Sequence, residues 1–463
     1  MKFKFIRLIL LQLIFCVNVF ACSNRNDPTE SKQPETPSTY ILPSGKAIYI
    51  PQDLINNDFT KEDSQWSYYR MAYSDNFVVF WEKGFGDDPS TTPKQNMQVN
   101  IQDLLKKAEL FYGVNVNKLK FVIPGQSNTD KFRMMIFLKY QTEWLATGSG
   151  YDDVIGALWV NPSTCQPVGS TIAHEVGHCF QYQVYCDNKT GDPGYRYGFG
   201  DNGEGGNAFW EQCAQWQSFK VYPEEQFTNY YFNEYLNSCN KNILHETPRY
   251  ANYFIQDYWC SKHGMDFIGK LWRMAKKPED PVETYKRITN IDQKTFNDEI
   301  FDAARRFVNW DIDSIRVYGK NYRGRSQCKL KILSDGYLTI DSTQCIENYG
   351  YNVITLDTPS MATTVSADFK GMAGTTKYRK LNIDKAGWRY GFVAYLKDGT
   401  CTYSNIFSEN EGKAVFNCPT NVSKLYFVVS GAPTIHWHHS WDNDDSNDEQ
   451  WSYKVKFYGT NYN

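Results

Sequence analysis

The sequence lacks several features that mark other classes of protein. Beyond residue 21 it has no apolar stretch long enough to span a bilayer. It has no block of Lys and Arg, and its net charge is −3, which argues against nucleic acid as a partner. No Gly-x-Ser-x-Gly motif indicates a serine hydrolase. Histidine is scarce, at seven residues in 463, so the position of each histidine is informative.

The overall composition is that of a globular protein. Hydrophobic residues make up 41% and charged residues 22% of the chain, which differs from a disordered sequence. A chain of 463 residues exceeds one ordinary domain, so two or three cores are expected.

Two of the seven histidines form an HExxH motif, His174-Glu175-Val176-Gly177-His178. On a helix, residues four apart lie on one face, so both imidazoles can reach one metal ion. Glu175 then lies beside the open coordination position, where it can accept a proton from an attacking water. We therefore expect the helix that begins near Ser170 or Thr171 to carry an active site.

Two histidines do not complete a zinc site, and a third protein ligand is needed. The three-histidine extension HExxHxxGxxH is excluded, because positions 181 and 184 hold Gln181 and Val184. Glu211 lies on a predicted helix over residues 207–219 and is the preferred third ligand. Glu204 is the alternative, but neighbouring glycines would hold it less rigidly. Two histidines and one glutamate favour one Zn(II) ion over Mg(II) or Ca(II).

The HExxH motif and the later Glu211-Gln212-Cys213-Ala214 resemble the HExxH and Glu-x-x-Ala motifs of gluzincin metallopeptidases. The resemblance implies a zincin-like α+β domain, here residues 61–322, that hydrolyses peptide bonds in extracellular proteins or glycoproteins. It implies His174, His178 and Glu211 as zinc ligands and Glu175 as the catalytic base. Such a site also needs an oxyanion stabiliser, and the sequence does not select among three residues in the right region. These are His245, Tyr250 and Tyr253.

The N-terminus predicts export. Lys2, Lys4 and Arg7 precede an apolar run over residues 8–20, and Ala21-Cys22 follows. This pattern resembles a bacterial lipoprotein signal, which implies a signal peptide over residues 1–21, lipidation of Cys22 and a place on the outer membrane surface. An ordinary secretory signal is the alternative. The whole chain looks like uncharacterised surface lipoproteins of Bacteroides-type gut bacteria, in contact with the membrane only through the lipid.

Residues 22–203 also contain a predicted tether, three predicted strands and a glycine motif. Residues 22–60 are rich in polar residues and proline and predict a flexible tether. Strands are expected over residues 76–81, 132–138 and 154–160. Gly156–Val160 is the candidate for an exposed edge strand that binds an extended peptide, with an interior position as the alternative. The glycines of residues 198–203 form GxGxxG, but the flanking elements do not fit a nucleotide site.

Residues 323–463 predict an all-β sandwich of jelly-roll type, because short strand patterns alternate with turns. Disulfides are plausible between neighbouring strands, with Cys328–Cys345 and Cys401–Cys418 as the nearest pairs.

The end of the chain carries a second group of histidines. His436 and His438 alternate like residues on one strand face and could bind a metal. The acidic run of residues 442–449 could bind Ca(II), with a solvated loop as the alternative. Three tryptophans nearby would fit a sugar-binding face, namely Trp437, Trp441 and Trp451. A surface lipoprotein that binds glycan or protein on a non-catalytic zincin scaffold is therefore the rival function.

Overall fold

A five-stranded mixed sheet carries the first part of the fold. The computed structural model describes residues 39–188, 194–195 and 208–463. The strand order is β1-β2-β3-β5-β4, with β2, β3 and β5 parallel and both outer strands antiparallel to their neighbours. The strands are β1 (Met71–Tyr73), β2 (Phe77–Trp81), β3 (Met134–Leu138), β4 (Ala146–Tyr151) and β5 (Ile155–Val160).

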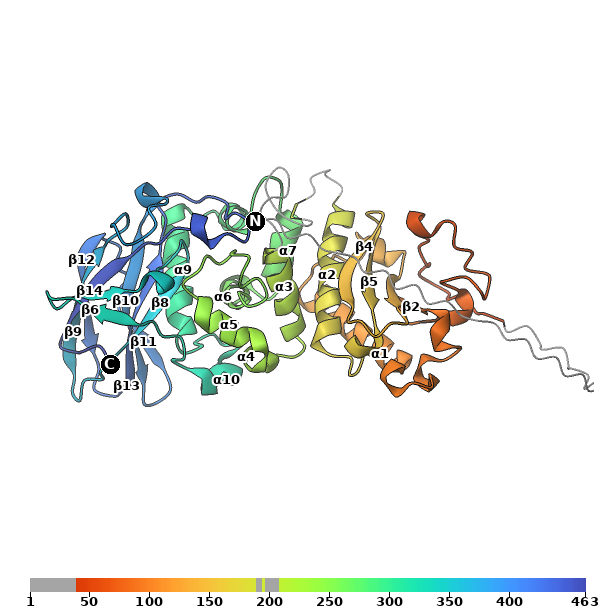
Figure 1. Ribbon diagram of the computed structural model, residues 1–463, viewed down its shortest axis with the longest axis horizontal. Coiled ribbons are helices and arrows are strands. Elements are labelled where there is room, and N and C mark those ends of the chain that lie inside the picture. The colour runs from red at the N-terminus through yellow and green to blue at the C-terminus, as the bar shows by residue number, and fades with distance from the viewer. Residues whose placement is uncertain (1–38, 189–193, 196–207) are drawn as a thin grey trace, which may run out of the picture. The chain divides into compact units, whose positions relative to one another are not determined.

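Helices cover one face of this sheet and continue the chain beyond it (Figure 1). Two of them carry the predicted site and begin where the sequence indicated. The helices are α1 (Ile101–Gly113), α2 (Ser170–Asp187), α3 (Ala208–Phe219), α4 (Glu225–Thr228), α5 (Tyr230–Ser238), α6 (Phe254–His263), α7 (Phe267–Met274), α8 (Pro281–Thr289), α9 (Gln293–Phe307) and α10 (Arg316–Gly319). None of the described helices has the length and apolar content that a membrane crossing requires.

The edge of the sheet next to α2 is β4, and β5 is an interior strand. The prediction that Gly156–Val160 forms the exposed edge was therefore wrong. Strand β5 is almost wholly buried because β3 and β4 flank it and α2 packs on its face. Strand β4 was not predicted, because its sequence, Ala-Thr-Gly-Ser-Gly-Tyr, has few of the β-branched and aromatic residues that are typical of strands.

Glycines allow α2 to lie unusually close to the sheet. A Cβ atom at Gly148 would lie 2.1 Å from the backbone oxygen of Glu175, and one at Gly156 would lie 2.9 Å from the Cβ of Cys179. On the opposite side of α2, Gly177 faces Ala214 of α3. Helix α2 is thus enclosed between the β4–β5 hairpin and α3 (Figure 1), which explains why every residue over 172–184 is buried.

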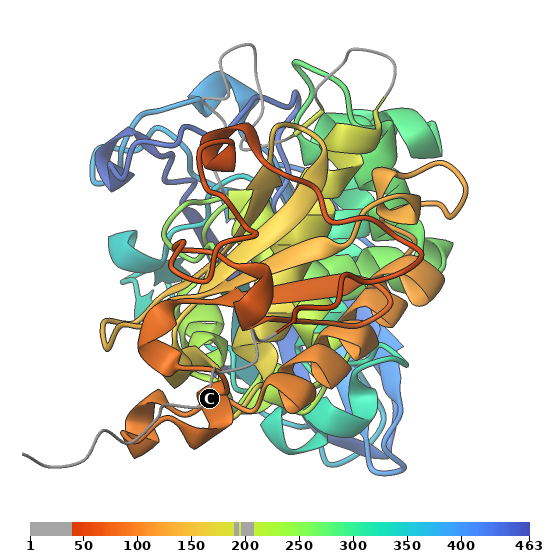
Figure 2. The same ribbon diagram turned by 90° about the vertical axis from the view of Figure 1, so that its right-hand side faces the viewer.

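The opposite face of the sheet is covered by the chain that precedes it. Figure 2 shows residues 40–70 running across that face. Phe59 packs on Phe80 of β2 and Trp66 on Phe137 of β3, while Ala47 pairs with Phe132. Residues 40–60 lie within the range expected to form a tether, and here they are part of the packed structure.

The last part of the chain forms two antiparallel sheets. Their strand orders are β11-β10-β13-β8 and β12-β9-β14-β7-β6. The strands are β6 (Leu330–Ile332), β7 (Leu338–Ile340), β8 (Tyr351–Leu356), β9 (Thr363–Gly371), β10 (Trp388–Leu396), β11 (Cys401–Tyr403), β12 (Glu411–Cys418), β13 (Val422–Gly431) and β14 (Tyr453–Tyr458). Apolar side chains from both sheets form one core, which confirms the predicted α+β part followed by a β-sandwich.

The first of these sheets also contributes to the core of the α+β part. Tyr351, Val353 and Val428 lie in the same buried cluster as the apolar residues of α6 and α9. Residues 40–463 accordingly form a single compact unit, and the division at residues 322 and 323 stays a prediction.

The two predicted disulfides do not form. Cys328, Cys345, Cys401 and Cys418 are all thiols. Cys401 lies opposite Tyr395 of β10, whereas Cys418 lies opposite Thr363 of β9, so the second pair is divided between the two sheets.

Replacement of Gly148 by alanine tests the close packing of α2. The added methyl group would overlap the backbone of α2, so we expect a loss of about 1–3 kcal/mol of stability, measured by denaturant unfolding. Gly113→Ala is the matched control, because the nearest atom to its added Cβ is 3.9 Å away. An unchanged stability for Gly148→Ala would contradict the packing described here.

Candidate metal centre

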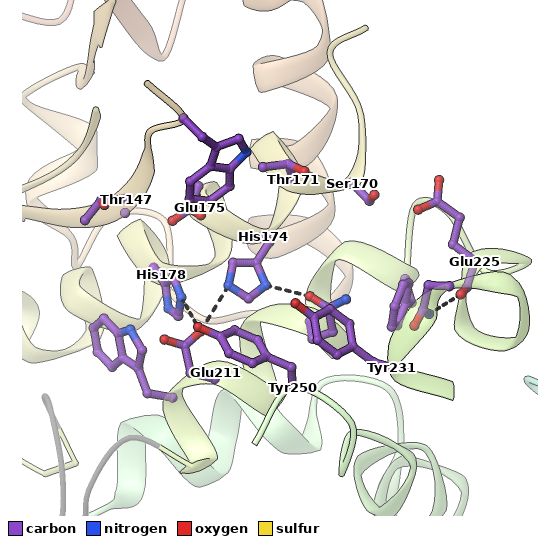
Figure 3. A pocket seen from close by; sticks show the side chains of 16 residues that line it. Thr147, Ser170, Thr171, His174, Glu175, His178, Glu211, Glu225, Tyr231 and Tyr250 are labelled. Atoms are coloured by element: carbon purple, nitrogen blue, oxygen red, sulfur yellow. Dashed lines mark hydrogen bonds and ion pairs between the residues drawn. The ribbon is translucent and has the colours of Figure 1, made fainter. Parts of the chain in front are cut away.

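Two histidines and one glutamate converge between α2 and α3. The Nε2 atom of His174 lies 3.2 Å from Oε2 of Glu211, and Nε2 of His178 lies 3.1 Å from the same oxygen. Figure 3 shows the three side chains meeting in this way. Their ligand atoms all lie within 4.8 Å of one another, so the structure brings together the predicted metal ligands.

Two glutamines hold the far nitrogens of these imidazoles. Nδ1 of His174 lies 2.8 Å from Oε1 of Gln215, and Nδ1 of His178 lies 3.0 Å from Oε1 of Gln181. The orientation of the Gln181 amide is fixed, because its Nε2 donates to the carbonyl of Trp210 and to Gln217. Each Nδ1 therefore donates its proton to an amide oxygen, which leaves the lone pair of the neutral ring on Nε2.

This arrangement fits a cation. Two neutral imidazoles would direct their Nε2 lone pairs at an ionised carboxylate, and only a positive charge between them makes that favourable. Without an ion, protonated imidazoles have to take the place of that charge: although burial opposes ionisation, hydrogen bonds and charge from His174 and His178 lower the pKa of Glu211 below its ordinary value. Two histidines and one glutamate, with an amide oxygen accepting from the far nitrogen of each imidazole, match the donor set of a zinc site with three protein ligands.

The convergent ligands open onto a cavity of about 450 Å³. Glu175 lines it beside His174, and Thr147 and Gly148 bring the edge strand β4 to its wall (Figure 3). The remaining lining is mainly aromatic and polar and comes from several helices and loops. It consists of Trp144, Ser170, Thr171, Trp210, Gln215, Phe219, Glu225, Asn229, Tyr231 and Tyr250.

Of the three candidates for oxyanion stabiliser, Tyr250 alone lines the cavity. Its ring lies 6.1 Å from that of His174, centroid to centroid. Burial, followed by the charge of Glu211, raises the pKa of Tyr250, which keeps its hydroxyl protonated. Tyr253 is fully buried and donates to the carbonyl of Gln226, and His245 is fully buried beside Asp448.

Other predicted residues have different outcomes. Glu204 and the glycines of residues 198–203 lie outside the described residues, and so do Cys22 and the signal segment. Trp451 is fully buried, so the three tryptophans do not form one exposed sugar-binding face. His436 and His438 each face a carboxylate of the 280–283 segment.

Sequence reasoning missed the glutamines that hold the imidazoles of His174 and His178, although Gln215 follows Glu211 by one helical turn.

Substitution of Gln215 by leucine tests the hydrogen bond that orients the His174 ring. Without the acceptor for Nδ1, His174 loses its fixed tautomer and orientation, so we expect zinc affinity to fall by about 10–100-fold. Competition with a chromophoric chelator would measure it. Gln212→Leu is the control, because this buried residue of the same helix donates to the carbonyl of Ile243 and, among the described residues, forms no hydrogen bond with the three ligands. Equal affinities for the two variants would contradict the role of Gln215.

Three solved structures are distantly similar to this chain. The family 22 carbohydrate-binding module of Clostridium thermocellum Xyn10B is 9% identical, with a TM-score of 0.18, over 29% of this chain and 80% of that chain. The CBM22-1 xylan-binding domain of Paenibacillus barcinonensis Xyn10C has the same values. The M60 catalytic domain with two CBM51 domains of Clostridium perfringens ZmpB is 10% identical, with a TM-score of 0.20, over 85% of this chain and 60% of that chain.

These likenesses are too distant to support conclusions about function. No curated protein matches the chain. A family model does match it, over residues 41–463, and its description is a family of unknown function, DUF6055. Since that match spans most of the sequence, the chain belongs to the DUF6055 family.

Proposed function

We propose that this protein is a zinc metallopeptidase of gluzincin type that hydrolyses peptide bonds in extracellular proteins or glycoproteins. The observation that carries the proposal is the convergence of His174, His178 and Glu211 at one wall of a cavity that Glu175 also lines. The HExxH helix supplies the first two ligands, and α3 supplies the third.

His174, His178 and Glu211 would hold the metal ion through two imidazole nitrogens and one carboxylate oxygen. A Zn(II) ion bound there supplies Lewis acidity, which polarises a carbonyl and lowers the pKa of water towards about 7. Gln215 and Gln181 keep both imidazoles in the tautomer that binds metal.

Glu175 is the proposed general base. Its side chain is 5% exposed and lines the cavity next to His174, so its carboxylate can take a proton from the attacking water. The same carboxyl group can then deliver the proton to the leaving amine nitrogen. Tyr250, which lines the same cavity and whose hydroxyl stays protonated, is the proposed donor of a hydrogen bond to the negative charge that develops on the carbonyl oxygen.

Strand β4 offers a binding surface for an extended substrate. It ends the sheet, and Thr147 and Gly148 lie where this edge meets the cavity. A peptide that adds to the edge as a further strand would pass its backbone across the cavity beside Glu175. Trp144, which is 67% exposed, borders the same entrance and can contact a substrate side chain.

The cellular location is also a proposal. Export and lipidation at Cys22 would place the site on the outer membrane surface, where proteins and glycoproteins of the surroundings are accessible. The basis is the signal-like sequence of residues 1–22 alone.

Replacement of Glu175 by glutamine tests the proposed base. We expect cleavage of a mixture of denatured proteins, followed by mass spectrometry of new N-termini, to fall by about 10²–10⁴-fold. Zinc content should stay unchanged, because Glu175 is not a ligand. Glu225→Gln, a second carboxylate of the cavity wall, is the matched control and should retain activity. A wild-type chain that binds zinc but cleaves nothing would instead support the non-catalytic scaffold.

Replacement of Tyr250 by phenylalanine tests the oxyanion contact. Loss of one hydrogen-bond donor to the transition state lowers kcat by about 10²–10³-fold, whereas KM and zinc content should change little. Tyr231→Phe is the control, because this ring stacks on Tyr250 at 5.2 Å and lines the same cavity. A kcat for Tyr250→Phe equal to that of the control would exclude Tyr250 from this role.

A further inference from the structure

A second set of potential metal ligands lies away from the HExxH helix. Asp280 and Glu283 come from the start of α8, and His436 and His438 come from the loop that follows β13. Each of the four offers one ligand atom, and these atoms all lie within 4.8 Å of one another. We refer to these four residues as the α8 cluster.

The start of α8 fixes both carboxylates. Asp280 is the N-cap residue, and its Oδ1 accepts a hydrogen bond from the backbone N–H of Glu283 at 2.9 Å. Oε2 of Glu283 accepts in return from the backbone N–H of Asp280 at 3.1 Å. This capping box holds the two side chains on one side of the helix start, while Oδ2 of Asp280 remains directed at His436.

The loop after β13 brings the two histidines to these carboxylates. Nε2 of His436 lies 2.9 Å from Oδ2 of Asp280, and Nε2 of His438 lies 2.7 Å from Oε2 of Glu283. On the far side of the first ring, Nδ1 of His436 lies 2.9 Å from the hydroxyl of Tyr349. Both Nε2 atoms therefore point towards the carboxylates.

The cluster is buried on one side and accessible on the other. The side chains of His436 and Asp280 are 6% and 0% exposed, whereas those of His438 and Glu283 are 33% and 40% exposed. A buried aspartate is costly unless a positive charge compensates it, and a cation can enter from the exposed half. The buried half of the cluster thus favours a firmly bound cation, and the exposed half gives that cation a path from solvent.

Imidazole nitrogen and carboxylate oxygen are both donors that zinc accepts. Ligand distances of about 2.0–2.2 Å place the corners of a tetrahedron roughly 3.4 Å apart. The two histidine–carboxylate pairs, at 2.9 and 2.7 Å, would need to separate by about 0.5–0.7 Å to reach this spacing. Four protein ligands leave no open position, which is the pattern of a structural site rather than a catalytic one.

We propose that the α8 cluster is a second zinc site, and that its ion fastens the loop after β13 of the sandwich to helix α8. The site is independent of the proposed peptidase activity, since none of its residues lines the catalytic cavity. The ion would join two parts of the chain that are far apart in sequence: His436 and Asp280 are 156 positions apart.

Elemental analysis of the purified full chain and its variants tests the proposal. We expect about two zinc ions per chain for wild type, one for His438→Ala, one for His174→Ala, and none for the double variant. His438 is the preferred target, because it is the more exposed of the two histidines and its loss should not prevent folding. His263→Ala is the matched control: this exposed histidine belongs to none of the potential metal groups among the described residues, so two ions should remain.

A thermal measurement separates a bound ion from simple ion pairs. In the His174→Ala chain the α8 cluster should hold the remaining zinc, so a strong chelator should lower Tm by several degrees. The same chelator should leave the Tm of the double variant unchanged. Glu283→Gln provides a second removal of a ligand if His438→Ala does not fold, as judged by circular dichroism.

Three outcomes would overturn the proposal. One is a wild-type chain with no more zinc than His438→Ala. Another is a folded Glu283→Gln chain that keeps both ions. The last is a His174→Ala chain whose Tm does not respond to the chelator, in which case the four side chains form histidine–carboxylate ion pairs only. Zinc content and Tm do not depend on peptidase activity, so these measurements can contradict the second zinc site without contradicting the proposed function, and the reverse.

Discussion

The close approach of α2 to the sheet is the constraint on which the candidate centre depends. Gly148 and Gly156 remove the side chains that would separate the helix from β4 and β5, and Gly177 does the same towards α3. With the helix so enclosed, His174 and His178 have little freedom to turn away from Glu211. The cavity therefore owes its geometry to backbone packing first and to the identities of the ligands second.

Polar groups in this interior are held by one another. Gln181 connects the His178 ring to the carbonyl of Trp210 and to Gln217, and Gln217 donates in turn to Asn115. These side chains are almost fully buried, and each partner compensates the cost of taking the other out of water. The ligand set is therefore anchored to α3 and to the helical turn Val114–Lys118 that follows α1, as well as to its own helix.

Much of this could be predicted from the sequence, and the reasons for success and failure are physical. The HExxH helix, Glu211 and strands such as β2 and β3 were predictable, because metal-ligand spacing and apolar runs are local patterns. Strand β4 was not, since its glycines serve close packing rather than strand propensity. The carboxylate partners of His436 and His438 could not be predicted for a different reason: they lie about 155 residues away in the sequence, and only the tertiary fold brings them together.

The shared core between the α+β part and the sandwich has a consequence for how the chain can be divided. Tyr351, Val353 and Val428 bury their side chains with those of the helices, so a cut between the two parts would expose an apolar face on each fragment. The sandwich is therefore an integral part of the helical core rather than a separable domain. Evolution could then add to or remodel its outer loops freely, but could exchange it for another module only by rebuilding the helices beneath it.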